Sequence, residues 1–373
     1  MELKNRKYGI PLLLASLICA AAILVYLYKS CLIFVKYAEH GVLKQKIELE
    51  SNYRYIFLID GAEASFETDD KTVSIQRSVV NFKYRGDKIV RITGYPQPLS
   101  ERVMAKSSSS IDLEYSGTIG LCKKTSAYVI SEGEIRVKPM SSVIAGTSNV
   151  SSYRDRRGRI KTLILDGEWA PASIRVGIKS GGFSSLQHQS IEFISDGKML
   201  LQDKKAHISV KISARNGITL TPCGSGIVAE IGGSRQVYKN RLYISPGENI
   251  SGIDILSFQR GYGFATYPGT FEITEADGKL NVINEASLED YLKRVVPSEM
   301  PSSFGLEALK AQSVAARTYA LSDMYGGRFS SSGFHVDDST MSQVYNNSPE
   351  NELATKAVNS TRGIVMTYEG SLA

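Results

Sequence analysis

The chain has 373 residues, which is long enough for two domains and a well-buried core. Its hydrophobic content of 42% and charged content of 22% are ordinary for a globular protein and exclude an intrinsically disordered chain. Of the net charge of +6, residues 1–46 contribute +5, from seven Lys or Arg against two Glu, so the rest is nearly neutral. This distribution points to a membrane surface as a partner and argues against nucleic acid.

An uncharged segment of nineteen residues, Ile10–Tyr28, follows a basic tail at 1–9. Its length predicts a transmembrane anchor at 10–28, and no small-x-small cleavage site follows it. A cleaved signal peptide is the alternative. Basic residues flank both ends of the segment, so the charge rule leaves its orientation open. Residues 29–52 are predicted to form a juxtamembrane stalk, with a short helix at Val42–Glu50.

The next region, 53–168, is predicted to be a β-rich domain of unknown role. Short runs of β-branched and aromatic residues predict its strands, at 55–59, 72–75, 78–82 and 88–93. The charged segment Arg154–Lys161 is interpreted as a solvated hairpin tip, with an anionic glycan or lipid contact as the alternative. Cys122 and Cys223 are either free thiols or one disulfide.

Residues 169–373 form the last predicted domain. Strands are expected at 190–195 and 206–212, and a hairpin is expected around the turn Asp277-Gly278. Helices are predicted only from Ser287 onward. Because strands are followed by helices, we predict an α+β fold class: a β-rich N-terminal ectodomain, then an α+β domain, with one N-terminal transmembrane helix.

Two prolines bracket a single acid in the segment Pro297-Ser-Glu-Met-Pro301, between a short amphipathic helix and a longer one. Each proline fixes its own φ and pushes the preceding residue out of the helical region, so Glu299 is predicted to lie on a stiff loop. A rigidly placed acid suits glycosidic-bond chemistry. The alternative is a carboxylate that only complements the dipole of the following helix.

The motifs around this acid read Leu-Glu-Asp-Tyr-Leu at 288–292, Val-Val-Pro-Ser-Glu-Met-Pro at 295–301 and Glu-Ala-Leu-Lys-Ala-Gln-Ser-Val-Ala-Ala-Arg-Thr-Tyr at 307–319. They resemble the stage II sporulation protein D family, which also includes the amidase-enhancer proteins. The resemblance covers about the last 200 residues. Family members continue beyond the position of Ala373, so the domain at 169–373 is expected to be truncated or naturally short.

The resemblance implies that Glu299 is the catalytic acid of a lytic transglycosylase. In this chemistry, one carboxyl group protonates the glycosidic oxygen and then accepts a proton from the C6 hydroxyl of the substrate. The product is a 1,6-anhydro sugar, and no water is consumed. The acid must stay protonated before the reaction, and the apolar neighbours Met300 and Val296 are expected to desolvate it.

Arg317 is the second catalytic candidate, on the helix that starts at Leu306. By resemblance it orients Glu299 or contacts the glycan. The alternative is a structural ion pair with an acid such as Asp338, because a partly buried arginine needs an anionic partner.

Three further residues are predicted to bind substrate, namely Gln312, Asp338 and Gln343. Gln312 alternatively holds the backbone, and the other two alternatively shape the groove. His335 and Asp337 complete a possible set of metal ligands with Asp338, but oxygen and nitrogen ligands on one loop are weak evidence. Some relatives have cysteines where this chain has Asp337 and Ser342. The sequence therefore predicts no metal and no cofactor.

The leading hypothesis is a membrane-anchored lytic transglycosylase that cleaves peptidoglycan glycan strands during sporulation and engulfment. The resemblance implies as partners a cell-wall amidase or endopeptidase and an engulfment membrane protein. It also implies a single-pass protein of the cell membrane, with a cytoplasmic N-terminus and an extracytoplasmic body. The alternatives are a non-catalytic glycan-binding enhancer of a cell-wall amidase and a scaffold built on the β-rich domain.

Overall fold

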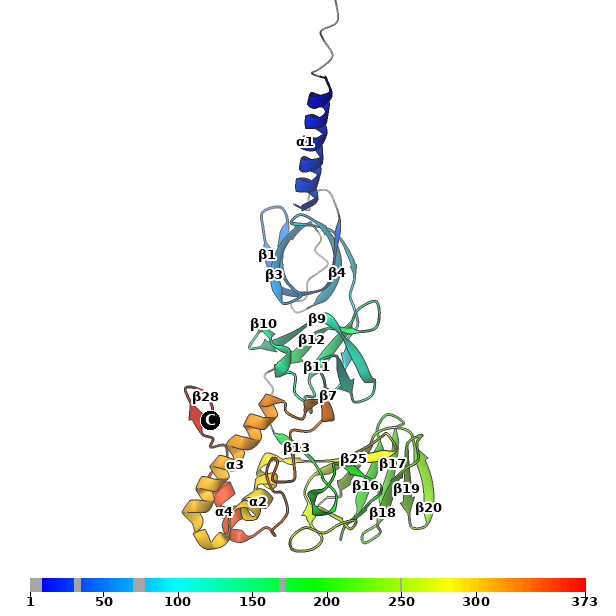
Figure 1. Cartoon of the computed structure of the whole chain (residues 1–373), viewed down its shortest axis with the longest axis vertical. Coiled ribbons are helices and arrows are strands. Elements are labelled where there is room, and N and C mark those ends of the chain that lie inside the picture. The colour runs from blue at the N-terminus through cyan, green and yellow to red at the C-terminus, as the bar shows by residue number, and fades with distance from the viewer. Residues whose placement is uncertain (1–8, 30–34, 70–77, 168–171, 249) are drawn as a thin grey trace, which may run out of the picture. The chain divides into compact units, whose positions relative to one another are not determined.

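The computed structural model of the chain describes residues 9–29, 35–69, 78–167, 172–248 and 250–373 (Figure 1). The chain divides into two compact units. The barrel unit comprises 1–100, 121–138 and 151–168, and the C-terminal unit comprises 101–120, 139–150 and 169–373. Two short segments that precede 169 in sequence therefore belong to the C-terminal unit. The predicted basic tail up to residue 8 and the predicted strand at 72–75 lie outside the described residues.

Helix α1 (Gly9–Lys29) forms where the sequence is uncharged. However, no helix among the described residues is both long and apolar enough to cross a membrane. The predicted transmembrane helix at 10–28 is therefore wrong.

The predicted stalk is also wrong where the structure describes it, because 36–48 is a strand and contains no helix. This strand opens a closed barrel with the strand order β1-β2-β3-β5-β4. Its strands are β1 (Lys36–Glu48), β2 (Tyr53–Ile59), β3 (Ala62–Thr68), β4 (Val79–Arg85) and β5 (Lys88–Gly94). The buried side chains of Leu43, Phe57 and Phe82 lie in the barrel core. As a strand, β1 buries apolar surface that an isolated stalk helix would leave in water, and this burial stabilises the strand.

A second sheet completes the barrel unit. Its strands are β6 (Leu99–Ser100), β9 (Gly117–Ser131), β10 (Glu134–Lys138), β11 (Val150–Arg154) and β12 (Ile160–Asp166). Strand β12 pairs with β9 in parallel, and β10 pairs with β9 as an antiparallel hairpin. Strand β9 begins in the C-terminal unit, where Gly117–Gly120 pairs with β8.

The C-terminal unit contains two larger sheets. The first has the order β17-β16-β21-β24-β25-β13-β26, with β14 beside β25, and the second has the order β20-β19-β18-β15-β22-β23. The strands of this unit are β7 (Val103–Lys106), β8 (Ser110–Leu113), β13 (Ser173–Gly177), β14 (Gln187–His188), β15 (Ile191–Ile194), β16 (Met199–Asp203), β17 (Ile208–Ile212), β18 (Ile218–Pro222), β19 (Ile227–Ile231), β20 (Ser234–Tyr238), β21 (Leu242–Pro246), β22 (Ile253–Ile255), β23 (Thr266–Tyr267), β24 (Thr270–Ala276), β25 (Lys279–Ser287), β26 (Val336–Asp337), β27 (Thr367–Tyr368) and β28 (Ser371–Leu372).

The predicted hairpin around Asp277-Gly278 is confirmed. Ala276 pairs with Lys279, and both turn residues have a positive φ, at 54° and 71°. Two positive φ values are what a two-residue hairpin needs in order to match the twist of its strands.

Three helices follow this hairpin: α2 (Leu288–Glu299), α3 (Leu306–Gly326) and α4 (Glu352–Ser360). Figure 1 shows them grouped on one side of the C-terminal unit, away from strands β16 to β20. They share one core with both sheets. The described chain is β-rich, with 28 strands against four α-helices. This correction to the predicted fold class arises because many two- to five-residue strands carry too little periodicity to be recognised in sequence.

Candidate functional site

Glu299 is the last residue of helix α2 and does not lie on a loop. Ser287 begins the helix as its N-cap, and its side-chain oxygen accepts the Asp290 N–H at 3.1 Å. Pro297 lies inside the last turn. Because proline has no N–H, Pro297 removes one intrahelical bond, to the Lys293 carbonyl, close to the end of the helix. The carboxylate of Glu299 therefore lies at the end of a helix, and the predicted stiff loop is wrong.

A segment from 343 to 348 wraps around this end of α2. The Val344 N–H donates to Glu299 Oε1 at 2.6 Å. The Ser298 hydroxyl oxygen accepts the N–H groups of Asn347 and Ser348, at 3.0 and 3.1 Å, and donates to Arg294 O at 2.6 Å. These contacts fix the backbone on both sides of the acid. One carboxylate oxygen of Glu299 is thereby held, and its side chain is exposed to solvent.

Solvent exposure of Glu299 differs from the sequence-based expectation. Val296 is fully buried in the core, while Met300 is only half-buried. The apolar neighbours therefore face the sheet and do not enclose the carboxyl group. Any desolvation of Glu299 has to come from a bound substrate.

Aromatic side chains form the floor beneath the acid. Tyr291 and Tyr345 are fully buried, with ring centroids 4.8 Å apart, and the Tyr345 hydroxyl donates to Asn284 Oδ1 at 3.0 Å. Burial raises the pKa of Tyr291 well above its ordinary value. Both hydroxyl groups donate a hydrogen bond within the protein, to Gln343 and to Asn284.

Gln343 connects this floor to helix α3. Its Oε1 accepts the Tyr291 hydroxyl at 3.1 Å, and its Nε2 donates to Ala316 O at 3.3 Å. The side chain is buried. Gln343 thus anchors the segment whose next residue, Val344, holds Glu299.

Asp338 is fully buried, and both of its carboxylate oxygens are occupied. Oδ1 accepts the Lys179 N–H at 3.0 Å, and Oδ2 accepts Arg260 Nη2 at 2.5 Å. Its neighbour Asp337 accepts the Ser339 hydroxyl at 2.6 Å and lies 3.5 Å from the Lys179 amine. Both aspartates are therefore committed to internal contacts.

Arg317 contacts Glu289, not Glu299 or Asp338. Its Nε and Nη2 donate to the two carboxylate oxygens of Glu289, at 2.9 and 2.7 Å. Its Nη1 donates to Ile364 O at 3.1 Å, and the side chain is 1% exposed. This bidentate pair joins α2 to α3 and to the segment after α4. It leaves no guanidinium N–H of Arg317 directed at Glu299.

The remaining predicted residue, Gln312, is half-buried on α3. Its side chain makes no hydrogen bond with the described part of the chain. Sequence reasoning missed Ser298, Glu289 and the Val344 N–H. Glu289 lies in the Leu-Glu-Asp-Tyr-Leu motif, which was a signal. No pattern pointed to the backbone donor, because it lies 45 residues from the acid it binds.

Exposed aromatic side chains lie close to this helix end. Phe304 is 65% exposed and follows α2 directly. Tyr262 and Phe264 are exposed on a loop whose Gly261 N–H donates to Asn347 Oδ1 at 2.8 Å. A Cβ at Gly261 would lie 2.6 Å from Asn347 O, so the close approach of this loop requires glycine. Such rings offer flat surfaces for the apolar faces of sugars.

Comparison with known proteins bears on residues 276–368, which match the family described as SpoIID, stage II sporulation protein. This segment resembles a SpoIID domain. All five predicted site residues fall inside it.

Curated relatives agree with this assignment. The chain is 48% identical over 81 residues to the amidase enhancer of Bacillus subtilis, covering 22% of this chain and 10% of that protein. It is 40% identical over 100 residues to stage II sporulation protein D of the same organism, covering 23% and 29%. It is 35% identical over 141 residues to an uncharacterized protein of Brachyspira hyodysenteriae, covering 36% and 38%. The matches thus span less than half of each relative.

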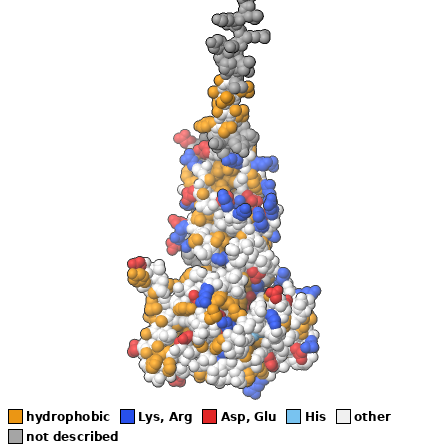
Figure 2. Space-filling model, viewed as in Figure 1, with side chains coloured by type: hydrophobic (Ala, Val, Ile, Leu, Met, Phe, Trp, Pro, Cys, Tyr) orange, Lys and Arg blue, Asp and Glu red, His pale blue; other side chains and the backbone are white. Residues whose placement is uncertain are grey.

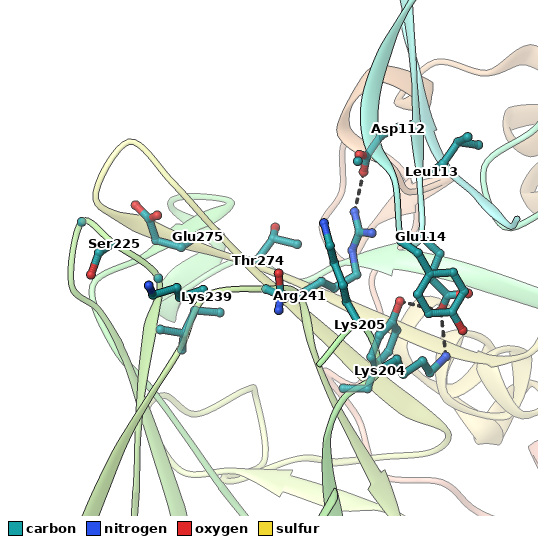
Figure 3. Close-up of a pocket in the computed structure, with 17 residues that line it drawn as sticks. Asp112, Leu113, Glu114, Lys204, Lys205, Ser225, Lys239, Arg241, Thr274 and Glu275 are labelled. Atoms are coloured by element: carbon teal, nitrogen blue, oxygen red, sulfur yellow. Dashed lines mark hydrogen bonds and ion pairs between the residues drawn. The ribbon is translucent and has the colours of Figure 1, made fainter. Parts of the chain in front are cut away.

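A cavity of about 450 Å³ lies in the C-terminal unit but outside the SpoIID domain (Figure 3). Its walls carry charged side chains that largely pair with one another. Arg241 contacts Asp112 at 2.5 Å, and Lys204 contacts Glu114 at 2.8 Å. None of the predicted site residues lines it. Among the described residues, no three His, Cys, Asp or Glu side chains come together as a potential metal site.

Proposed function

We propose that this protein is a lytic transglycosylase that cleaves the glycan strands of peptidoglycan, with Glu299 as its single acid and base. The observation that carries the proposal is that the Glu299 carboxylate is exposed, whereas the carboxylates of Asp337 and Asp338 are bonded within the protein. Asp337 and Asp338 are buried and bonded within the protein. A retaining hydrolase needs a second carboxylate as nucleophile. Neither aspartate can serve in this way, which favours a reaction that uses one carboxyl group.

The contact with Val344 supports different roles for the two oxygens of Glu299. Because the Val344 N–H donates to Oε1, that oxygen presents a lone pair and not a proton. In the proposed reaction the proton is carried by Oε2, which accepts no hydrogen bond from the described part of the chain. Oε2 would protonate the glycosidic oxygen and then, as a carboxylate oxygen, accept the proton of the C6 hydroxyl as the anhydro ring closes.

Two further features support a glycan substrate. Phe304, Tyr262 and Phe264 are exposed. The loop of Tyr262 and Phe264 is bonded through Gly261 to Asn347, whose N–H donates to Ser298 beside the acid. The names of two relatives refer to sporulation and to enhancement of an amidase. We propose on this basis a role in cell-wall remodelling during sporulation, on the outer side of the cell membrane. A cell-wall amidase or endopeptidase and an engulfment membrane protein are the proposed partners.

The test is the Glu299→Gln variant on isolated glycan strands, with products analysed by mass spectrometry. We expect the wild type to release fragments ending in a 1,6-anhydro sugar. The variant should lose at least about 100-fold in rate, the lower end of what a general acid contributes. Glutamine keeps the oxygen that accepts the Val344 N–H, so the fold should persist.

Glu307→Gln is the matched control, because Glu307 is an exposed acid on α3 paired only with Lys310. It should retain full activity. Hydrolysed, non-anhydro ends from the wild type would overturn the transglycosylase assignment, and full activity of Glu299→Gln would overturn the role of Glu299.

The second candidate function is a non-catalytic glycan-binding enhancer of an amidase. It is favoured by the solvent exposure of Glu299 and by the commitment of Arg317 to Glu289. This function predicts that glycan strands sediment with the protein intact, and that Glu299→Gln stimulates an amidase as well as the wild type does.

A further inference from the structure

The β4–β5 hairpin of the barrel carries two like-charged pairs of side chains directly across from each other. Lys83 on β4 pairs with Arg91 on β5, and Arg85 pairs with Lys88. The intervening residues Phe82, Tyr84, Ile89 and Ile92 pack in the barrel core, so the four cations point outward. Like charges at directly opposite positions destabilise a sheet. The arrangement therefore calls for an explanation other than stability.

The positive strip formed by Lys83, Arg85, Lys88 and Arg91 has a lateral neighbour on β1. Tyr37 is opposite Lys83 in the register of β1 and β4. The Arg156 guanidinium lies 4.3 Å from the centre of the Tyr37 ring. Arg156, from the turn between β11 and β12, therefore lies beside Tyr37 on the strand next to Lys83. Figure 2 shows Lys and Arg side chains gathered over the part of the barrel that carries β4 in Figure 1.

The nearby acids offset the charge of the strip only in part. Glu67 is opposite Lys88 in the register of β3 and β5, but its carboxylate contacts Arg54 at 2.9 Å. Asp87 is exposed in the hairpin turn. None of the four cations of the strip lies within 4 Å of a carboxylate in the described part of the chain. All four are exposed, so the strip is a positive surface open to solvent.

We propose that this positive strip binds a linear polyanion with phosphodiester groups. The cations are spread along two strands and do not converge on one point, which suits a chain with repeated charges better than a single phosphate ion. Arginine forks and lysine point charges both bind phosphate oxygens well.

The experiment measures binding of the full chain to fluorescently labelled poly(glycerol phosphate) at several salt concentrations. Each phosphate contact on a single-stranded polyanion contributes about 0.7 to the slope of log affinity against log salt. Four contacts should give a slope of about −2.8. The variant Lys83→Gln/Arg91→Gln should weaken binding and reduce the slope to about −1.4.

Lys205→Gln/Lys239→Gln is the matched control, since it removes the same charge from exposed lysines around the cavity of the C-terminal unit. It should leave affinity and slope unchanged. An equal loss in the control would show that only net charge matters and would overturn the proposal. Unchanged binding by the strip variant, or binding to anionic phospholipid vesicles without binding to the polymer, would overturn it as well.

Discussion

Two buried arginines of the C-terminal unit and the cations of the barrel hairpin lie in opposite environments. In the C-terminal unit, Arg175 is fully buried between Glu272 and Glu285, at 2.8 and 3.0 Å. Arg317 is likewise buried against Glu289. On the barrel, Lys83 and Arg91 are exposed and face each other. Buried charge is matched because an unmatched one would carry a large desolvation cost, whereas exposed charge is free to serve binding.

This contrast also separates residues that hold the fold from those that meet a partner. Arg317 and Asp338 were both candidates for contact with substrate, and each is enclosed by protein partners. Glu299 has one protein contact and is open to solvent. Within one motif, burial distinguishes the supporting residues from the acid proposed to react.

The largest expected effect comes from breaking a buried pair. Arg317→Met removes both bonds to Glu289 and the bond to Ile364 O, and should lower the free energy of unfolding by about 3–5 kcal/mol. Urea denaturation of the full chain measures this loss. Lys310→Met, which removes an exposed pair with Glu307, should cost less than about 1 kcal/mol. Equal costs for the two variants would refute the structural role of Arg317.

A pH effect of about 3 kcal/mol is expected from His335. Its Nδ1 accepts the Arg175 N–H at 3.1 Å, and its Nε2 donates to Ala145 O at 2.8 Å, so the ring is neutral. Burial lowers its pKa from 6.5 to about 4. Because the unfolded state binds the proton more readily, the contribution of neutral His335 to the free energy of unfolding is complete above pH 6.5. It is lost as the pH falls toward 4.

The measurement is the free energy of unfolding at pH 7 and at pH 4.5. His335→Gln should show a smaller loss between these two conditions than the wild type. His207 is exposed, so His207→Gln should leave the pH dependence unchanged. An unaltered pH dependence in His335→Gln would mean that other groups account for the acid sensitivity.

The smallest effect has the opposite sign. Without a polyanion, Lys83→Gln/Arg91→Gln should raise the free energy of unfolding by about 0.2–0.5 kcal/mol at low salt, because a like-charged pair is removed. High salt should abolish the difference through screening. A destabilised variant would show that Lys83 and Arg91 stabilise the barrel and are not a repulsive pair.

Local signals were sufficient for several parts of the fold. Asp277-Gly278 predicted its hairpin, because a two-residue turn with positive φ favours this dipeptide. Ser287 with its following apolar pattern marked the start of α2. The same local rules failed at Pro297, which continues the helix, and at 36–48, where a predicted stalk is a barrel strand. In both places, burial against distant strands outweighed a local preference.

The sequence by itself indicated Glu299 as the candidate acid, together with the motif around it. The tertiary structure decided what surrounds that acid. Arg317 lies 28 residues from the glutamate it binds, and Val344 lies 45 residues from Glu299. Periodicity and spacing describe neighbours along one helix or strand, whereas these contacts form only when separate elements pack together. The solvent exposure of each charged side chain and the partners that it binds therefore follow from the tertiary fold.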